Sequence, residues 1–168
     1  VEFHNTSLFI EGNIMLVKEI MTRAIKTITP ETHLQEVASL MCLHRFSGLP
    51  VVEGEDELVG FLAERDVLRY LFPSIKDIME STGGMGSFDF ESMENDYQKI
   101  LPLSAADLMI RNVITVNSEI PILKAVSVMA KSNFRRIPVA DGKTLVGMIS
   151  LGDIHRAIFM KNFSGTEK

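Results

Sequence analysis

Apolar and polar residues follow the same pattern twice along the chain. Each copy opens with a β-branched run, Ile25–Ile28 or Val113–Val116, which is typical of a strand. Apolar residues then recur at spacings of three and four, the period of a helix that buries one face. They are Leu34, Val37, Ala38 and Met41 in the first copy, and Ile122, Ala125, Val126 and Met129 in the second. The two series lie 88 positions apart, which predicts a duplicated unit.

A hairpin and a second helix follow in each copy. The predicted strands are Leu49–Val52 with Leu58–Leu62, and Ile137–Ala140 with Leu145–Ile149. Gly54 and Gly142 suit the tight turns between them, because glycine accepts positive φ. The closing helices carry apolar residues at matching places: Val67, Tyr70 and Leu71, then Ile154, Ala157 and Ile158. The predicted order is β-α-β-β-α, twice, and two such units most simply bury their apolar faces against each other.

The duplication divides the chain into five predicted parts. They are an arm (1–16), repeat one (17–72), a connector (73–104), repeat two (105–161) and a tail (162–168). The connector has a glycine-rich centre and an acidic stretch, and we expect short helices near 74–79 and 92–100. Met15 would be a natural translation start, so residues 1–14 are either foreign to the native chain or an arm that packs elsewhere.

Charge and composition restrict the choice of partners. A net charge of −5 argues against a broad surface for nucleic acid or anionic membrane, although a local phosphate pocket remains compatible with it. No apolar run approaches the roughly 20 residues that span a bilayer, and no cleavable signal pattern is visible. Cys42 is the single cysteine, which fits a reducing compartment. We therefore expect a cytoplasmic protein that binds neither nucleic acid nor membrane.

Short motifs in both copies carry a family resemblance. Each copy begins with a methionine motif, Met-Thr-Arg from Met21 and Met-Ile-Arg from Met109. After the first helix comes Leu-Pro-Val in the first copy and Ile-Pro-Val in the second. In both copies Leu-Val-Gly then precedes an aspartate, Asp66 or Asp153. With these motifs the chain resembles a pair of cystathionine-β-synthase (CBS) domains, the arrangement called a Bateman module. The resemblance implies an α+β fold of two β-α-β-β-α repeats packed sheet to sheet about a pseudo-two-fold axis. It also implies two clefts that bind AMP, ADP, ATP or S-adenosylmethionine, energy-sensing regulation, and association into a homodimer.

In repeat two, Ser150-Leu151-Gly152-Asp153 matches the ligand motif of the family. An ionised carboxylate only accepts hydrogen bonds, and the two ribose hydroxyls are donors, so Asp153 is the candidate ribose ligand. Ser150 is expected to reach the sugar or its phosphate. The alternative is structural, because Ser-x-x-Asp before an apolar-periodic run also resembles a capping box.

Basic and apolar residues complete the cleft that we predict for repeat two. Arg135 and Arg136 are candidate phosphate ligands, since guanidinium stays charged and donates two hydrogen bonds at once. Solvated surface ion pairs are the alternative for both. The predicted adenine slot consists of Asn112, Val113, Ile114, Ile137 and Pro138. For Val113 and Ile137, ordinary core packing is the better interpretation of the side chains.

Repeat one has the equivalent carboxylate, Asp66, but lacks the serine and the two arginines. Ala63 stands where repeat two has Ser150, and Ser47-Gly48 stands where it has the two arginines. The corresponding residues of this weaker cleft are Ile25, Lys26, Leu49, Pro50 and Asp66. Both differences favour repeat two, which predicts that the ligand binds mainly there.

No catalytic residue is predicted. The four histidines fall at no metal-ligand spacing, and no nucleophile with an oriented base is visible. We therefore expect neither a metal nor a required cofactor. The leading hypothesis is a non-enzymatic regulatory module that binds an adenine nucleotide or S-adenosylmethionine, and signals to an unknown regulated protein by changing repeat or dimer geometry. The alternative is a protein-interaction and dimerisation module with empty clefts.

Overall fold

The computed structural model describes residues 14–71, 98 and 101–163. Repeat one contains α1 (Val17–Ile20), α2 (Leu34–His44), β1 (Gly48–Glu53), β2 (Glu57–Ala63) and α3 (Glu64–Leu71). Repeat two contains α6 (Ala105–Leu108), α7 (Ile122–Ser132), β3 (Arg136–Asp141), β4 (Thr144–Ser150) and α8 (Leu151–Phe163). The helices predicted near 74–79 and 92–100 lie outside the described residues, apart from Gln98.

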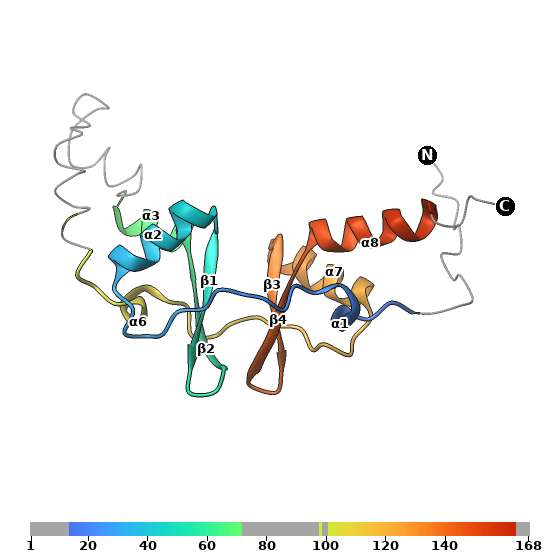
Figure 1. Cartoon of the computed structure of the whole chain (residues 1–168), viewed down its shortest axis with the longest axis horizontal. Helices are drawn as coiled ribbons and strands as arrows, with labels where there is room; N and C mark the ends of the chain where they lie inside the picture. The colour runs from blue at the N-terminus through green and yellow to red at the C-terminus, as the bar shows by residue number, and fades with distance from the viewer. Residues whose placement is uncertain (1–13, 72–97, 99–100, 164–168) are drawn as a thin grey trace, which may run out of the picture.

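The strands form two antiparallel hairpins that meet at their tips. Their order is β1-β2-β4-β3, which reads the same after the repeats are exchanged, as a pseudo-two-fold axis requires. Strands β2 and β4 pair at one position, Glu57 with Thr144, and then diverge (Figure 1). Backbone bonds from Leu58 N–H to Lys143 (2.8 Å) and from Leu145 N–H to Asp56 (2.9 Å) hold the tips together. The predicted α+β fold of two packed repeats is confirmed.

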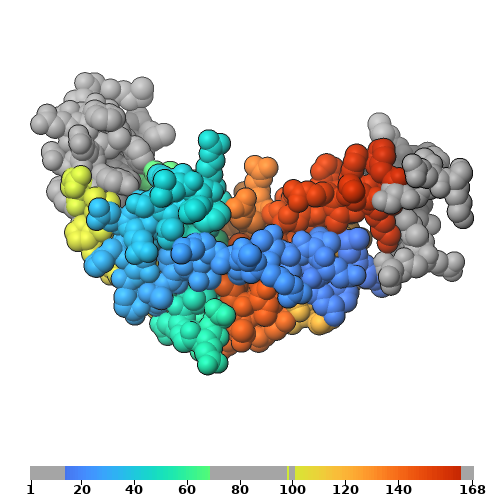
Figure 2. All heavy atoms as spheres, viewed as in Figure 1, coloured from blue at the N-terminus to red at the C-terminus, as the bar shows by residue number. Residues whose placement is uncertain are grey.

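The leading segment of each repeat packs into the core of the other repeat. Val17 of α1 is fully buried in a cluster with Ile122 and Ile149 of repeat two. Ala105 of α6 is likewise fully buried in a cluster with Leu34 of repeat one. In Figure 1, α1 lies beside α7 and α8, whereas α6 lies on the side of α2. Figure 2 shows the blue N-terminal segment running across both halves, so neither core is complete without the other repeat.

Two glycines allow these crossing segments to approach the last strand of the opposite repeat. Backbone bridges join Thr22 to Met148 and Ile110 to Phe61, next to Gly147 and Gly60 respectively. A Cβ on Gly147 would lie 2.7 Å from Met21 Sδ and 3.0 Å from the Thr22 carbonyl oxygen. A Cβ on Gly60 would collide with the Met109 side chain. The glycine in each Leu-Val-Gly motif is therefore explained by packing between the repeats.

The leading strands predicted at 25–28 and 113–116 are reduced to single parallel bridges, Ile28 with Val51 and Val116 with Val139. Proline explains the difference. Ile28 N–H donates to Pro50 and Val52 N–H donates to Ile28, but the next bond of a parallel ladder would need an N–H at residue 50. Pro138 stops the second ladder in the same way.

The spacing of Thr32 and Gln35 resembles a capping box, but the structure does not form one there. Helix α2 begins at Leu34, with His33 as its N-cap and no side-chain cap bond. Thr32 Oγ1 instead accepts a hydrogen bond from Thr29 N–H (3.0 Å). The first N–H groups of α2 donate to the backbone of Leu101 and Leu103, so the chain entering repeat two replaces the cap.

Candidate ligand clefts between the repeats

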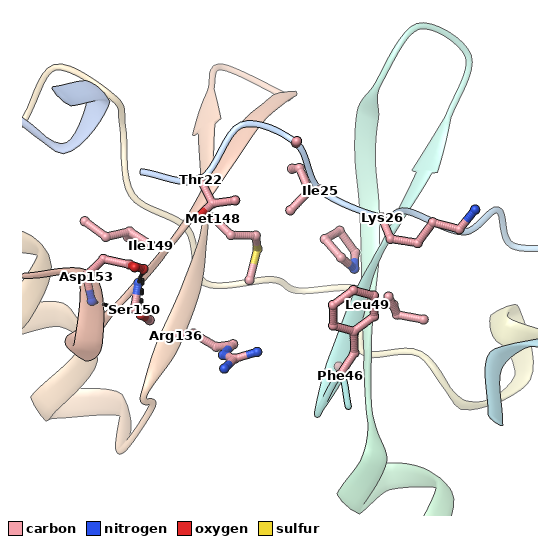
Figure 3. A pocket seen from close by; sticks show the side chains of 13 residues that line it. Thr22, Ile25, Lys26, Phe46, Leu49, Arg136, Met148, Ile149, Ser150 and Asp153 are labelled. Atoms are coloured by element: carbon pink, nitrogen blue, oxygen red, sulfur yellow. Dashed lines mark hydrogen bonds between the residues drawn. The ribbon is translucent and has the colours of Figure 1, made fainter. Parts of the chain in front are cut away.

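A small cavity of about 240 Å³ lies between the two hairpins (Figure 3). Ile25, Lys26, Leu49 and Pro50 line it from repeat one. Arg136, Ser150 and Asp153 line it from repeat two. Figure 3 shows Arg136 and Phe46 pointing into the space between the hairpins, whereas the Lys26 side chain points away from it. This smaller cleft therefore joins the candidate carboxylate of repeat two to the candidate slot of repeat one.

A larger cavity of about 760 Å³ is also lined by residues of both repeats. Asn112, Val113, Ile114, Arg135, Arg136 and Pro138 line it from repeat two. Ala63, Glu64 and Arg65 line it from repeat one, and Ser150 reaches its edge as well. This larger cleft contains most of the predicted adenine slot and both predicted phosphate ligands, but Asp153 is not part of its lining.

The grouping of residues thus differs from the sequence expectation. We predicted that Asp153 shares a cleft with Asn112, Val113 and Ile114, but the structure places it opposite Ile25 and Leu49. Ile137 is fully buried in the core, in agreement with the core interpretation. Neither Ile137 nor Asp66 lines either of these two cavities.

The exchange of leading segments produces this arrangement. Because Thr22 bridges to Met148, the chain that follows it, including Ile25, lies against the end of β4 and the start of α8. The equivalent bridge from Ile110 to Phe61 places Asn112 against the end of β2. The sequence carries no signal for this pairing, because the repeats are alike and either pairing gives the same pattern.

Ser150 and Asp153 form a reciprocal cap at the start of α8. Asp153 Oδ2 accepts hydrogen bonds from Ser150 N–H (2.9 Å) and from Ser150 Oγ (2.6 Å). Asp153 N–H donates to Ser150 Oγ at 3.2 Å. The capping box, the structural alternative for these two residues, is therefore present in the structure. Among the described residues, Asp153 Oδ1 accepts no hydrogen bond and lies 3.9 Å from the guanidinium of Arg156, so this oxygen is available to donors in the smaller cleft.

Asp66 is held differently at the start of α3. Its Oδ2 accepts one backbone hydrogen bond, from Ala63 N–H at 3.2 Å, and its Oδ1 lies 3.8 Å from Arg65 Nε. The Asp66 side chain is 11% exposed, compared with 21% for Asp153. The repeat-one carboxylate is therefore the less accessible of the two.

Three arginines lie around the larger cleft. Arg136 is the first residue of β3, Arg135 directly precedes it, and both are exposed. Arg65 comes from the first turn of α3, and its guanidinium carbon lies 5.5 Å from the ring centre of Phe134, a cation–π contact between the two repeats. Sequence reasoning missed Arg65, because its place in the larger cleft depends on how the two repeats pack together, which has no local signal in the sequence.

Other kinds of site are not found in the part of the chain that the structure describes. Its histidine, cysteine, aspartate and glutamate side chains form no group of three or more suited to a metal ion. Each of its helices is too short or too polar to cross a bilayer.

Comparison with known proteins identifies the family. The family model described as CBS domain matches residues 17–73 and 105–160. The chain belongs to the CBS domain family. It is 30% identical over 162 residues to protein MJ1426 of Methanocaldococcus jannaschii, covering 90% of this chain and 95% of that one.

Two solved structures share the fold of this CBS-domain protein. The first is CBSX2 in complex with AMP, with a TM-score of 0.66, 21% identity, and 88% and 98% of the two chains covered. The second is the CBS domain pair of MJ0100 in complex with 5′-methylthioadenosine and S-adenosyl-L-methionine. It has a TM-score of 0.61 and 24% identity, with 89% and 99% covered.

Proposed function

We propose that this CBS-domain protein is a non-enzymatic regulatory module that binds an adenosine-containing ligand in the smaller cleft, where Asp153 accepts hydrogen bonds from the ribose. The observation that carries the proposal is the position of Asp153. Its Oδ1 has no close donor among the described residues and its side chain lines a cavity whose opposite wall is the apolar slot of Ile25, Leu49 and Pro50. Apolar walls suit the faces of a base, and a carboxylate suits the donor hydroxyls of a ribose.

The capping role of Asp153 is compatible with binding. A carboxylate has about four lone-pair positions, and the cap uses two of them, both on Oδ2. The cap also fixes the side-chain rotamer, so the carboxylate is oriented before a ligand arrives. Arg136 points into the same space and is the phosphate contact in this proposal.

The fold neighbours support the choice of ligand class. CBSX2 was solved with AMP, and MJ0100 with two adenosine derivatives, one of which is S-adenosyl-L-methionine. We propose the same class for this chain, with AMP, ADP, ATP and S-adenosylmethionine as the candidates.

In this proposal the ligand signals by contacting both repeats at once. The hairpins pair at their tips, at Glu57 and Thr144, and diverge toward the clefts. A ligand that contacts repeat one and repeat two together favours the arrangement in which both walls fit it, and it shifts the population accordingly. The cytoplasmic location, the homodimer and the regulated partner protein belong to the same proposal.

The decisive experiment is calorimetric and thermal-shift titration with the four ligands, on the wild type and on Asp153→Asn. Saturation at 100 times the dissociation constant stabilises a fold by about 2.7 kcal/mol. We expect Asp153→Asn to weaken binding at least tenfold, because a hydrogen bond to a charged group contributes about 1.5–3 kcal/mol. Asp66→Asn is the matched control and is expected to change little. Equal losses in the two variants would contradict the assignment of Asp153.

The second candidate is a protein-interaction module with empty clefts. The specific observation in its favour is α8, whose exposed side chains include Phe159 (48%), Met160 (58%) and Phe163 (62%). The two phenylalanine rings stack at 4.2 Å. This alternative predicts that none of the four ligands shifts the melting temperature, and that Phe159→Ser lowers the average mass measured by sedimentation equilibrium.

A further inference from the structure

The turns at the two hairpin tips differ in charge. The turn of repeat one, residues 53–57, contains four carboxylates, whereas the turn of repeat two, residues 141–144, contains one carboxylate and one lysine. The acidic residues are Glu53, Glu55, Asp56, Glu57 and Asp141, and the lysine is Lys143. All of them are exposed. Because like charges repel, a cation placed between the two turns lowers the energy of bringing them together.

Lys143 contacts repeat one with both its side chain and its backbone. Its Nζ donates a hydrogen bond to Glu57 Oε1 at 2.9 Å, and its carbonyl oxygen accepts one from Leu58 N–H at 2.8 Å. The hydrogen bond to Glu57 and the attraction of its charge raise the pKa of the Lys143 ammonium above its ordinary value of 10.5. The lysine therefore remains charged at neutral pH, and we call its contact with Glu57 the tip ion pair.

The duplication copies the backbone bonds of the tips but not the tip ion pair. Lys143 corresponds to Asp56 and Thr144 to Glu57, each 87 residues apart. The bond from Leu145 N–H to the Asp56 carbonyl (2.9 Å) is thus the counterpart of the bond from Leu58 to Lys143. Asp56 and Thr144 cannot form an ion pair, so the charged contact exists once.

The tips can separate without opening either core. Strands β2 and β4 pair at a single position, Glu57 with Thr144, and neither hydrophobic core cluster includes Leu58 or Leu145. Breaking the two backbone bonds at the tips therefore leaves both clusters packed. Local openings of this kind occur where few buried contacts hold exposed backbone hydrogen bonds.

We infer that the tip ion pair controls local opening between the two repeats, because it is the charged contact that holds an acidic turn against its neighbour. The side chains of Lys143 and Glu57 are 82% and 48% exposed, so the contact is accessible to salt and its contribution is small. Removing the charge of Lys143 leaves the carboxylates of the two turns without the lysine between them. Separation of the tips then becomes more frequent, whereas the remaining contacts between the repeats are retained.

Native-state hydrogen exchange, followed by NMR on the ligand-free protein, measures this opening. We expect Lys143→Gln to accelerate exchange of the Leu58 and Leu145 amides about two- to fivefold, which is the effect of losing an exposed ion pair. The amides of Phe61 and Ile110 are the internal reference, because each donates to the carbonyl of the other across a second bridge between the repeats. Their exchange should change by less than about 1.5-fold.

Lys124→Gln is the matched control, since it removes the same charge from an exposed position on α7, outside both turns. It should leave the exchange of Leu58 and Leu145 within about 1.5-fold of the wild type. Equal acceleration by Lys124→Gln and Lys143→Gln would overturn the inference. Unchanged exchange of the two tip amides in Lys143→Gln, or equal acceleration of Phe61 and Ile110, would overturn it as well.

A charge swap separates the ion pair from other effects of changing Lys143. Lys143→Glu should accelerate exchange at the tips more than Lys143→Gln, because it adds a further carboxylate. Combining it with Glu57→Lys restores an ion pair of reversed direction, and the exchange of Leu58 and Leu145 should return to within about twofold of the wild type. A double variant that exchanges as fast as Lys143→Glu alone would contradict the inference. Since no ligand is added, none of these outcomes depends on the proposed adenosine site.

Discussion

The two clefts occupy equivalent positions in a duplicated fold, yet the charges that line them differ. Arg136 and Ser150 line both clefts. The smaller cleft adds the carboxylate of Asp153, whereas the larger one adds Arg65, Arg135 and one acidic residue, Glu64. The differences lie at a few lining positions, where Ser150 corresponds to Ala63 and Gly152 to Arg65. The shared geometry comes from buried apolar residues that both repeats keep. The duplication thus preserves what the fold needs, while the lining is free to diverge.

A similar contrast exists where each repeat ties its first loop to its hairpin. In repeat two, Asp141 accepts hydrogen bonds from Ser118 N–H (3.0 Å), Ser118 Oγ (2.8 Å) and Asn117 Nδ2 (2.8 Å). Repeat one has Pro30 at the position of Ser118, which supplies neither a hydroxyl nor an N–H. The two repeats therefore reach the same fold with different polar contacts.

The largest expected effect tests whether the two cores behave as one. Leu62→Ala in repeat one and Ile149→Ala in repeat two remove equivalent, fully buried side chains. Each should lower the free energy of unfolding by about 2–5 kcal/mol, because of lost burial and a residual cavity. Since each core contains a segment of the other repeat, urea denaturation followed by circular dichroism should show one transition for both variants. Two separate transitions in either variant would show that the repeats unfold independently.

The next effect concerns the glycines under the crossing segments. Gly147→Ala should cost about 1–3 kcal/mol, because the new methyl would meet the Thr22 carbonyl oxygen, and the Thr22–Met148 bridge holds that oxygen in place. Gly60→Ala should cost less, because its closest contact is the flexible Met109 side chain and the nearest backbone oxygen is 3.4 Å away. Chemical denaturation of both variants measures the difference. A larger loss for Gly60→Ala would refute this ranking.

The caps provide a smaller contrast in the absence of ligand. Asp153→Ala removes two hydrogen bonds at the start of α8, and should lower the free energy of unfolding by about 0.5–2 kcal/mol. Asp66→Ala removes a single bond of 3.2 Å at the start of α3 and should cost less. Thermal melts of the two ligand-free variants give the comparison. Equal costs would mean that the Ser150 hydroxyl adds nothing to the cap.

The fold was predictable from the sequence because its main determinants are local and repeated. The stripe containing Leu34 and Val37 buries as the helical period requires, and the hairpins form around turns at Gly54 and Gly142. The leading strands were not predicted correctly, because β-branched composition does not show that Pro50 withholds the donor needed for a longer ladder.

The composition of the clefts could be predicted only in part. Asp153 and Ser150 were found from their motif, and Arg135 and Arg136 from their charge, and all four line cavities between the repeats. The exchange of leading segments decides which apolar residues lie opposite Asp153. This exchange is a tertiary property that has no local signal in the sequence. Arg65 was missed for the same reason, since its place in the larger cleft is visible only after the exchange is known.

The smallest effect distinguishes the repeats by pH. Backbone and side-chain hydrogen bonds from Ser118 lower the pKa of Asp141 below its ordinary value of 3.8, with smaller contributions from Arg23 and Lys18. A carboxyl whose pKa is lower in the folded state stabilises the fold above its unfolded pKa, and this contribution is lost as the pH falls through the folded pKa. Asp141→Asn should therefore be less stable than the wild type at pH 7, by no more than about 1 kcal/mol because the site is largely exposed. The difference should shrink below a pH of about 4.

Urea titrations at several pH values measure this difference in the free energy of unfolding, with Glu53→Gln, the equivalent change in repeat one, as control. Because Pro30 cannot donate to Glu53, the control should show no such pH-dependent difference, and a matching one would mean that the Ser118 contact is not its source.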